Sequence, residues 1–206
     1  AKYGESDSAH IVAQLRGGLS AAYENFSMLN ALVSAVDNKD RYTRKHSEDV
    51  LKYSLQIAQE LGLDEGTLFQ VKIAALLHDV GKIGVPDDIL SKPGNLTDEK
   101  FAAIKQHPVM GAIMVNAVPG FEETLDAVRF HHERWDGKGY PSGLSGDDIP
   151  LLGRLMAVAD AYSAMTTDRT YRKAMGTERA DEILRGGAGT QWDPVCVDAF
   201  FRARGK

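Results

Sequence analysis

The sequence predicts an all-α fold. Apolar residues recur at intervals of three and four positions along most of the 206 residues, which is the period of an amphipathic helix. No stretch alternates convincingly between apolar and polar residues as a half-buried strand would. With 43% hydrophobic residues, the chain can bury a sizeable core without disulfides or structural metals. Length and pattern together indicate one helical bundle domain with an appendage.

The appendage is the N-terminal segment, residues 1–36. Apolar residues recur there at alternating spacings of three and four: Val12, Leu15, Leu19, Ala22, Phe26, Leu29, Val33 and Val36. These are the a and d positions of a heptad repeat, and so narrow a stripe suits a partner helix. We therefore expect a coiled-coil-like helix that joins two copies into a homodimer and passes a signal to residues 37–206. The alternative is an ordinary amphipathic helix packed on its own domain.

Caps and glycines bound the helices of the main domain. Asp40 or Thr43 can cap a helix that stops at Gly62, and Asp64 opens a second that runs to Gly81. Further helices are expected after Thr97 and near Phe121–His132, Leu151–Thr167, Thr177–Leu184 and Pro194–Arg202. Two loops rich in Gly and Pro separate them, Gly81–Gly94 and Trp135–Pro150.

Composition excludes several classes of protein. The net charge of −5 argues against a DNA or RNA polymer as ligand, because such proteins present basic faces. A small phosphorylated ligand needs only a few local cations. The single cysteine, Cys196, fits a reducing compartment and a cytoplasmic location. No apolar run approaches the roughly 18 residues of a membrane span, so we expect no membrane contact. Since the chain begins at Ala1, we expect it to be the cytoplasmic part of a larger, sensor-bearing protein.

Histidines carry the strongest functional signal. Five of the six fall in the helical region together with two aspartates in apolar surroundings: His46, His78, Asp79, His107, His131, His132 and Asp160. One buried histidine is usually a hydrogen-bonded core residue. An unpaired buried imidazole or carboxylate costs several kcal/mol, and seven such groups are hard to satisfy except around a shared metal centre. His10 lies apart from this set, in the heptad region.

The ligand types narrow the metal chemistry. His131 and His132 are adjacent and diverge by about 100° on a helix, so both reach one centre only near a helix end. Imidazole and carboxylate without thiolate suit a divalent first-row transition metal such as Fe, Mn, Ni or Zn. The number of groups exceeds what one ion needs. We expect two ions about 3.5–4 Å apart, bridged by Asp79, which is the arrangement that hydrolyses phosphate esters.

Two runs of residues resemble a known family. His78-Asp79, followed by Val80-Gly81-Lys82, resembles the HD dyad of the HD superfamily of metal-dependent phosphohydrolases. The run from His131 to Pro141, which contains Gly139-Tyr140-Pro141, resembles the HD-GYP subfamily. We call residues 135–150, which carry this tripeptide, the GYP loop. The resemblance covers roughly residues 35–201, and it implies an HD-domain helical bundle with residues 37–206 as the catalytic domain.

The resemblance implies an activity and a ligand set. It implies a phosphodiesterase that hydrolyses cyclic di-GMP to pGpG and then GMP through a hydroxide activated by two metals, although some relatives prefer cyclic GMP-AMP. The first metal would be held by His46, His78, Asp79 and Asp160, and Asp79 would bridge to a second held by His107, His131 and His132. Some members bind a third ion through a Glu that Tyr42 replaces here, so two metals are expected.

The resemblance also implies substrate contacts. Lys82 would act with Asp79 in catalysis by neutralising charge on the scissile phosphate, and Arg169 and Arg172 would contact phosphates. Tyr140 would shape the guanine pocket or a surface for a protein partner. Simpler alternatives exist: Lys82 could cap a helix, and both arginines could be surface cations.

Some residues keep two interpretations, and others depart from the family pattern. Trp135 could stack on a base or be a buried structural residue, whereas Trp192 and Cys196 are expected to be packing residues. Ser163 stands where the family usually has Asp, and Thr170 where it usually has Pro. Neither is a predicted ligand. The rival functions are a catalytically silent cyclic-dinucleotide-binding module and a nucleotide hydrolase of the broader superfamily.

Overall fold

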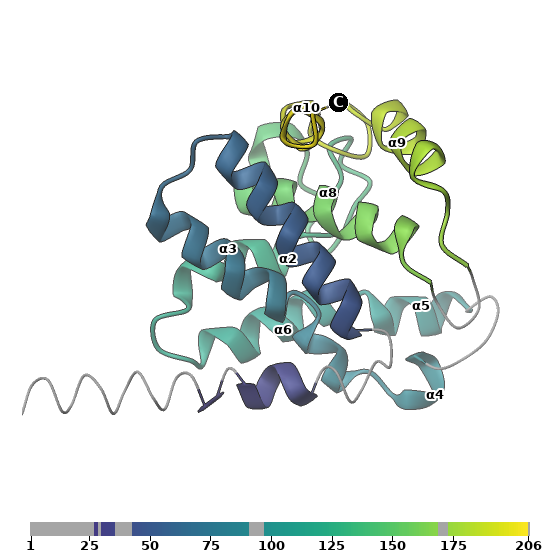
Figure 1. The fold of residues 1–206 in the computed structure, drawn as a ribbon. Coiled ribbons are helices and arrows are strands. Elements are labelled where there is room, and N and C mark those ends of the chain that lie inside the picture. Colours follow the sequence, from purple (N-terminus) through teal and green to yellow (C-terminus); the bar gives the residue numbers. More distant parts are fainter. Residues whose placement is uncertain (1–26, 29, 36–42, 91–96, 169–172, 206) are drawn as a thin grey trace, which may run out of the picture.

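The computed structural model describes residues 27–28, 30–35, 43–90, 97–168 and 173–205 (Figure 1). Its α-helices are α2 Thr43–Glu60, α3 Glu65–Leu77, α4 Asp87–Leu90, α5 Asp98–Ile104, α6 His107–Asn116, α7 Leu125–Phe130, α8 Leu151–Thr166, α9 Thr177–Gly186 and α10 Pro194–Ala203. Short 3-10 helices span Val80–Gly84, Glu122–Thr124 and Gly146–Asp148. Within the described ranges there is no strand beyond an isolated bridge between Ala188 and Trp192. The all-α prediction is confirmed.

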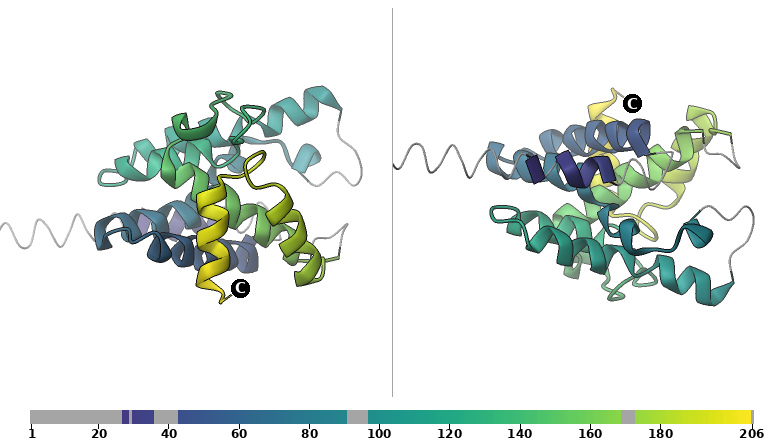
Figure 2. Two further views of the ribbon diagram at one scale, coloured as in Figure 1. Left: turned by 90° about the horizontal axis from the view of Figure 1, so that it is seen from above. Right: turned by 90° about the horizontal axis from the view of Figure 1, so that it is seen from below.

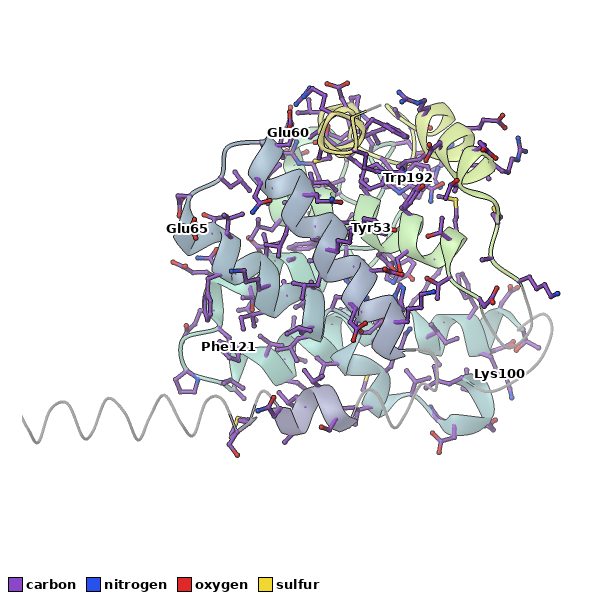
Figure 3. The ribbon with its side chains drawn as sticks, in the orientation of Figure 1. Tyr53, Glu60, Glu65, Lys100, Phe121 and Trp192 are labelled. Carbon is purple, nitrogen blue, oxygen red and sulfur yellow. The ribbon has the colours of Figure 1, made fainter. Side chains whose placement is uncertain are left out.

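The core lies where α2 and α8 pack against each other. α3 and α10 pack on α2, α7 packs on α8, and Figure 2 shows α10 crossing over both central helices. Tyr53 projects from α2 (Figure 3), and its ring lies edge-on to Tyr162 of α8 at 5.2 Å and to Phe200 of α10 at 5.5 Å. Both partners are fully buried. Each such side chain stabilises the fold by roughly 1.5–3 kcal/mol through the area it buries.

The predicted helix boundaries agree in most places with the structure. Asp64 accepts a hydrogen bond from Thr67 N at 3.0 Å, and Thr97 accepts one from Lys100 N at 3.4 Å. Gly62 has φ +71°, the left-handed conformation that ends α2 and that glycine adopts without strain. These contacts satisfy backbone groups that helix ends leave unpaired.

Two differences lie next to the histidines. The second helix ends at Leu77 rather than Gly81, so His78 and Asp79 lie in a turn before the 3-10 helix. Helix α6 has no counterpart among the predicted helices. Its sequence is apolar on every face, which removes the amphipathic period that identifies a helix. It begins with His107 and carries Pro108 in its first turn, a favoured position for proline.

The heptad segment lies almost entirely outside the described residues. Its one described position, Val33, packs with Leu32 against the core. Residues 30–35 form a short helical stretch, purple in Figure 1. The coiled coil, the homodimer and the boundary at residue 36 remain predictions. Among the described helices, none combines the length and the apolar character needed to span a bilayer.

Candidate metal centre

Seven predicted ligands converge at the junction of five helices. His46 lies on α2 and Asp160 on α8, the two helices that pack together at the core. His78 and Asp79 follow α3, and His107 begins α6. His131 and His132 follow α7. The His78 ring lies 5.6 Å from the ring of His46 and 5.2 Å from that of His131. The rings of His131 and His132 are 4.1 Å apart. Both of these residues lie just beyond a helix end, as the sequence predicts.

The site divides into two groups that share Asp79. Potential ligand atoms of Asp79, His107, His131 and His132 all lie within 4.8 Å of one another, and so do those of His46, His78 and Asp79. The shared carboxylate directs Oδ1 to His107 Nε2 at 3.3 Å and Oδ2 to His78 Nε2 at 3.4 Å. Asp160 Oδ1 lies 3.2 Å from His46 Nε2, beside the second group. The geometry fits one carboxylate bridging two cations.

Hydrogen bonds leave the Nε2 atoms of three histidines free to coordinate. Nδ1 of His78, His107 and His131 each lies 2.8 Å from the backbone carbonyl three residues earlier. A carbonyl only accepts hydrogen bonds, so each Nδ1 carries the proton and each Nε2 presents a lone pair. His78 Nε2 is buried and has no hydrogen-bond partner among the described residues. The Nε2 atoms of His107 and His131 face each other at 3.4 Å.

Electrostatics favour the same protonation states. Burial lowers the pKa of His78 and His131, and lowers that of His132 to about 4, so these imidazoles are neutral. Burial opposes ionisation of Asp79, but the Lys82 ammonium outweighs it and holds the carboxyl pKa well below its usual range. Burial also opposes ionisation of Asp160, but a hydrogen bond with His46 outweighs it and lowers the pKa of this carboxyl. Neutral imidazoles beside carboxylates suit divalent transition metals.

Two motif glycines permit close backbone approaches. A Cβ on Gly81 would lie 1.9 Å from the carbonyl oxygen of His107, so only glycine allows the turn after Asp79 to approach the start of α6. A Cβ on Gly139 would lie 2.4 Å from Arg134 N and 2.6 Å from His132 O. Both glycines therefore let segments that carry ligands pack against each other.

The structure constrains the predicted catalytic and substrate residues unequally. Lys82 Nζ lies 2.7 Å from Asp79 Oδ2, so its ammonium pairs with the shared carboxylate. Arg169 and Arg172 lie outside the described residues, as do Tyr42 and Thr170. Their roles remain predictions.

A cavity of about 290 Å³ adjoins the centre. His131, His132 and Asp160 line one side of it. Tyr140 also lines it, stacked on His132 with ring centroids 4.8 Å apart. The tryptophan at the cavity wall is Trp192 and not Trp135. Trp192 is buried, as a packing residue is expected to be, and it also lines the cavity. Cys196 is buried, in keeping with packing.

Two residues of the cavity region have no role in the sequence-based interpretation. Lys105, at the end of α5, places Nζ 4.7 Å from the Phe101 ring centroid and 5.5 Å from that of Tyr140. Both Lys105 and Phe101 line the cavity. A signal did exist, because a lysine and an aromatic residue four positions apart share one face of a predicted helix.

Glu133 anchors the GYP loop. Its side chain is buried, and its carboxylate accepts hydrogen bonds from the backbone N–H groups of Ser142 at 2.6 Å, Gly143 at 3.1 Å and Leu144 at 3.1 Å. The loop is held further by Trp135 N, which donates to Gln191 O, and by Asp136 N, which donates to Thr190 O. The wall that contains Tyr140 and Trp192 is thus one connected unit.

Comparisons with known proteins identify relatives of the chain. The family model described as HD domain matches residues 30–196. A Thermotoga maritima protein named cyclic di-GMP phosphodiesterase is 39% identical over 184 residues, covering 87% of this chain and 50% of that protein. A Vibrio cholerae protein named 3'3'-cGAMP-specific phosphodiesterase 3 is 36% identical over 176 residues, covering 85% of this chain and 38% of that protein.

Solved structures share the fold. The crystal structure of a cyclic GMP-AMP-specific phosphodiesterase of V. cholerae matches 87% of this chain and 48% of that one with a TM-score of 0.68, at 16% identity. The chain spans half or less of the length of these relatives. The helical-bundle prediction and the resemblance built on His78-Asp79 are confirmed, and the chain belongs to the HD domain family.

Proposed function

We propose that the chain is a metal-dependent phosphodiesterase that hydrolyses cyclic di-GMP to pGpG and then GMP. The observation that carries this proposal is the division of six buried or half-buried side chains into two groups that share Asp79, with Asp160 beside His46 and a cavity lined by aromatic and cationic residues next to them. The names of the Thermotoga and Vibrio relatives support cyclic dinucleotides as the substrate class.

We propose that the centre holds two divalent ions, Fe or Mn in preference to Ni or Zn. His46, His78 and Asp160 would hold one ion, His107, His131 and His132 the other, and Asp79 both. The buried Nε2 atom of His78, which has no hydrogen-bond partner among the described residues, and the opposed Nε2 atoms of His107 and His131 support this because each arrangement gains from an intervening cation. Two such ions supply Lewis-acid catalysis of phosphate ester hydrolysis.

The chain's own residues would bind and orient the substrate. Lys82, held beside Asp79, would stabilise the charge that develops on the non-bridging phosphate oxygens. The rings of Tyr140, Trp192 and Phe101 offer faces on which guanine can stack. Lys105 would contact the second phosphate of the cyclic dinucleotide, together with Arg169 and Arg172.

Cyclic GMP-AMP is the second candidate substrate, because a relative of 36% identity is named as specific for it. A silent binding module is disfavoured, since all seven candidate ligands are present and converge. We propose cytoplasmic action, which the free buried thiol of Cys196 supports. The homodimer through residues 1–36 and a protein partner at the GYP loop are further proposals.

Metal analysis of protein purified without oxygen, combined with turnover of cyclic di-GMP, cyclic GMP-AMP and cyclic di-AMP, tests the proposal. Asp79→Asn keeps the shape of the side chain but removes its charge. We expect it to lose bound metal and to reduce turnover by more than roughly a hundredfold, because the shared ligand is weakened. The control is Asp88→Asn, which alters an exposed carboxylate paired with Lys100. Full turnover by Asp79→Asn would eliminate the two-metal assignment.

A further inference from the structure

His46 differs from the other histidines of the centre in how its ring is held. His78, His107 and His131 use backbone carbonyls three residues earlier. His46 Nδ1 instead lies 2.8 Å from Ser163 Oγ, a side chain 117 positions away on α8. Ser163 is completely buried. On its Nδ1 side, the His46 imidazole is therefore held by a hydroxyl from another helix and not by a local carbonyl.

A hydroxyl can hydrogen-bond to Nδ1 in either tautomer of the ring, because it can both donate and accept a hydrogen bond. When Nε2 binds a cation, the remaining proton lies on Nδ1, and Ser163 Oγ is placed to accept it. The carbonyl oxygen of His46 lies 3.4 Å from Ser163 Oγ and gives the hydroxyl proton an acceptor in that state. Without the hydroxyl, the buried Nδ1–H would be left unpaired, which disfavours the metal-binding form of the ring.

We propose that Ser163 is a positioning residue for the metal group of His46, His78 and Asp79: its hydroxyl holds the His46 ring with Nε2 toward Asp160 and the cation. This inference rests on the proposed metal centre but not on the identity of the substrate. It predicts that the two metals differ in their sensitivity to Ser163, because within the described residues no hydrogen bond joins Ser163 to His107, His131 or His132.

Zinc binding to the full chain tests the proposal without any turnover. The bound metal is removed with a chelator, and Zn²⁺ is then added as a probe in competition with the chelator, which gives the stoichiometry and both affinities. We expect Ser163→Ala to weaken one of the two zinc ions by about tenfold or more and to leave the other within about twofold, as loss of a hydrogen-bond partner to a ligating histidine does. Nitrogen-15 NMR of the zinc-loaded protein should show His46 with its proton on Nδ1 in the unaltered chain.

Ser54→Ala is the matched control. Ser54 is also completely buried at the contact of α2 with α8, but its hydroxyl donates to Met156 Sδ at 3.4 Å and not to a candidate ligand. Ser163→Thr keeps the hydroxyl and should restore the weakened affinity. Equal effects of Ser163→Ala and Ser54→Ala, unchanged zinc affinities, or a Thr variant as weak as the Ala variant would each overturn the proposal.

If Ser163→Ala weakens one of two zinc ions but the unaltered protein hydrolyses no cyclic dinucleotide, the proposed function is refuted and the role of Ser163 is not. Turnover of a cyclic dinucleotide with zinc affinities that are indifferent to Ser163 would do the reverse. The two failures are therefore distinguishable.

Discussion

Replacement of Glu133 by glutamine tests whether one buried carboxylate holds the GYP loop in place. Glu133 Oε1 accepts from Ser142 N and Gly143 N, and Oε2 accepts from Leu144 N. Glutamine has the same shape but offers one acceptor oxygen and an NH₂ group. In either orientation the amide turns a donor toward a backbone N–H, so at least one part-buried donor loses its partner.

The magnitude follows from these contacts. An unpaired donor costs about 1–3 kcal/mol when it is buried, and the lower part of this range applies to these part-buried groups; loss of the negative charge also weakens the bonds that remain. We expect about 2–3 kcal/mol in total. For a domain of this size, that corresponds to a fall in Tm of roughly 4–12 °C. Because Tyr140 belongs to the same loop and stacks on His132, KM for the cyclic dinucleotide should also rise, while metal content stays unchanged.

Thermal unfolding, metal analysis and Michaelis kinetics measure these effects. The control is Glu122→Gln, which alters an exposed carboxylate with one hydrogen bond, from Gly120 N at 3.2 Å. Its Tm should change by about 1 °C at most, as for other surface substitutions. Similar Tm values for the two variants would refute the anchoring role of Glu133. A lower Tm with an unchanged KM would refute the link from the loop to substrate binding.

Three further predictions concern the substrate, the chelator-treated protein and the N-terminal helix. Lys105→Met should raise KM for cyclic dinucleotides by roughly tenfold or more. It should not change KM for bis(p-nitrophenyl) phosphate, which has no second phosphate. Lys100→Met is the control, and an equal rise in KM for both substrates would contradict a contact of Lys105 with the second phosphate. Since the pKa of His132 is about 4 when folded and about 6.5 when unfolded, the unfolded chain binds more protons between these values. Chelator-treated protein should therefore lose stability to urea as pH falls from about 6.5 to 4, and a flat profile would contradict the buried neutral imidazole. Leu19→Asp should convert a dimer to a monomer in sedimentation velocity, unless the heptad stripe packs on its own domain.

Much of the metal centre could be predicted because its signals are local. His78-Asp79 and His131-His132 each follow an apolar helix, so burial could be inferred from neighbours in sequence. The adjacent histidines also required a helix end, and α7 ends at Phe130, directly before them.

The remaining site residues depend on tertiary contacts. Ser163 contacts His46 across 117 positions, and Glu133 contacts a loop about ten residues ahead, so no local period reports either bond. Helix α6 was missed for the opposite reason, because apolar residues on its exposed side, such as Ile113, remove the amphipathic pattern. Trp192 reaches the cavity wall through the turn at residues 187–192, where a Cβ on Gly187 would lie 2.3 Å from its ring.

Helix ends explain why this fold suits a cation. The carbonyls that hold His78, His107 and His131 belong to the last turns of α3, α5 and α7, where carbonyls lack partners within the helix. Each imidazole satisfies one of these carbonyls through Nδ1 and turns Nε2 toward the centre. The same helix ends carry partial negative charge, which favours a cation close by. Three helices thus contribute both the orientation of a ligand and part of the field, whereas His46 lies in the first turn of α2 and finds the partner of its Nδ1 in Ser163 of α8.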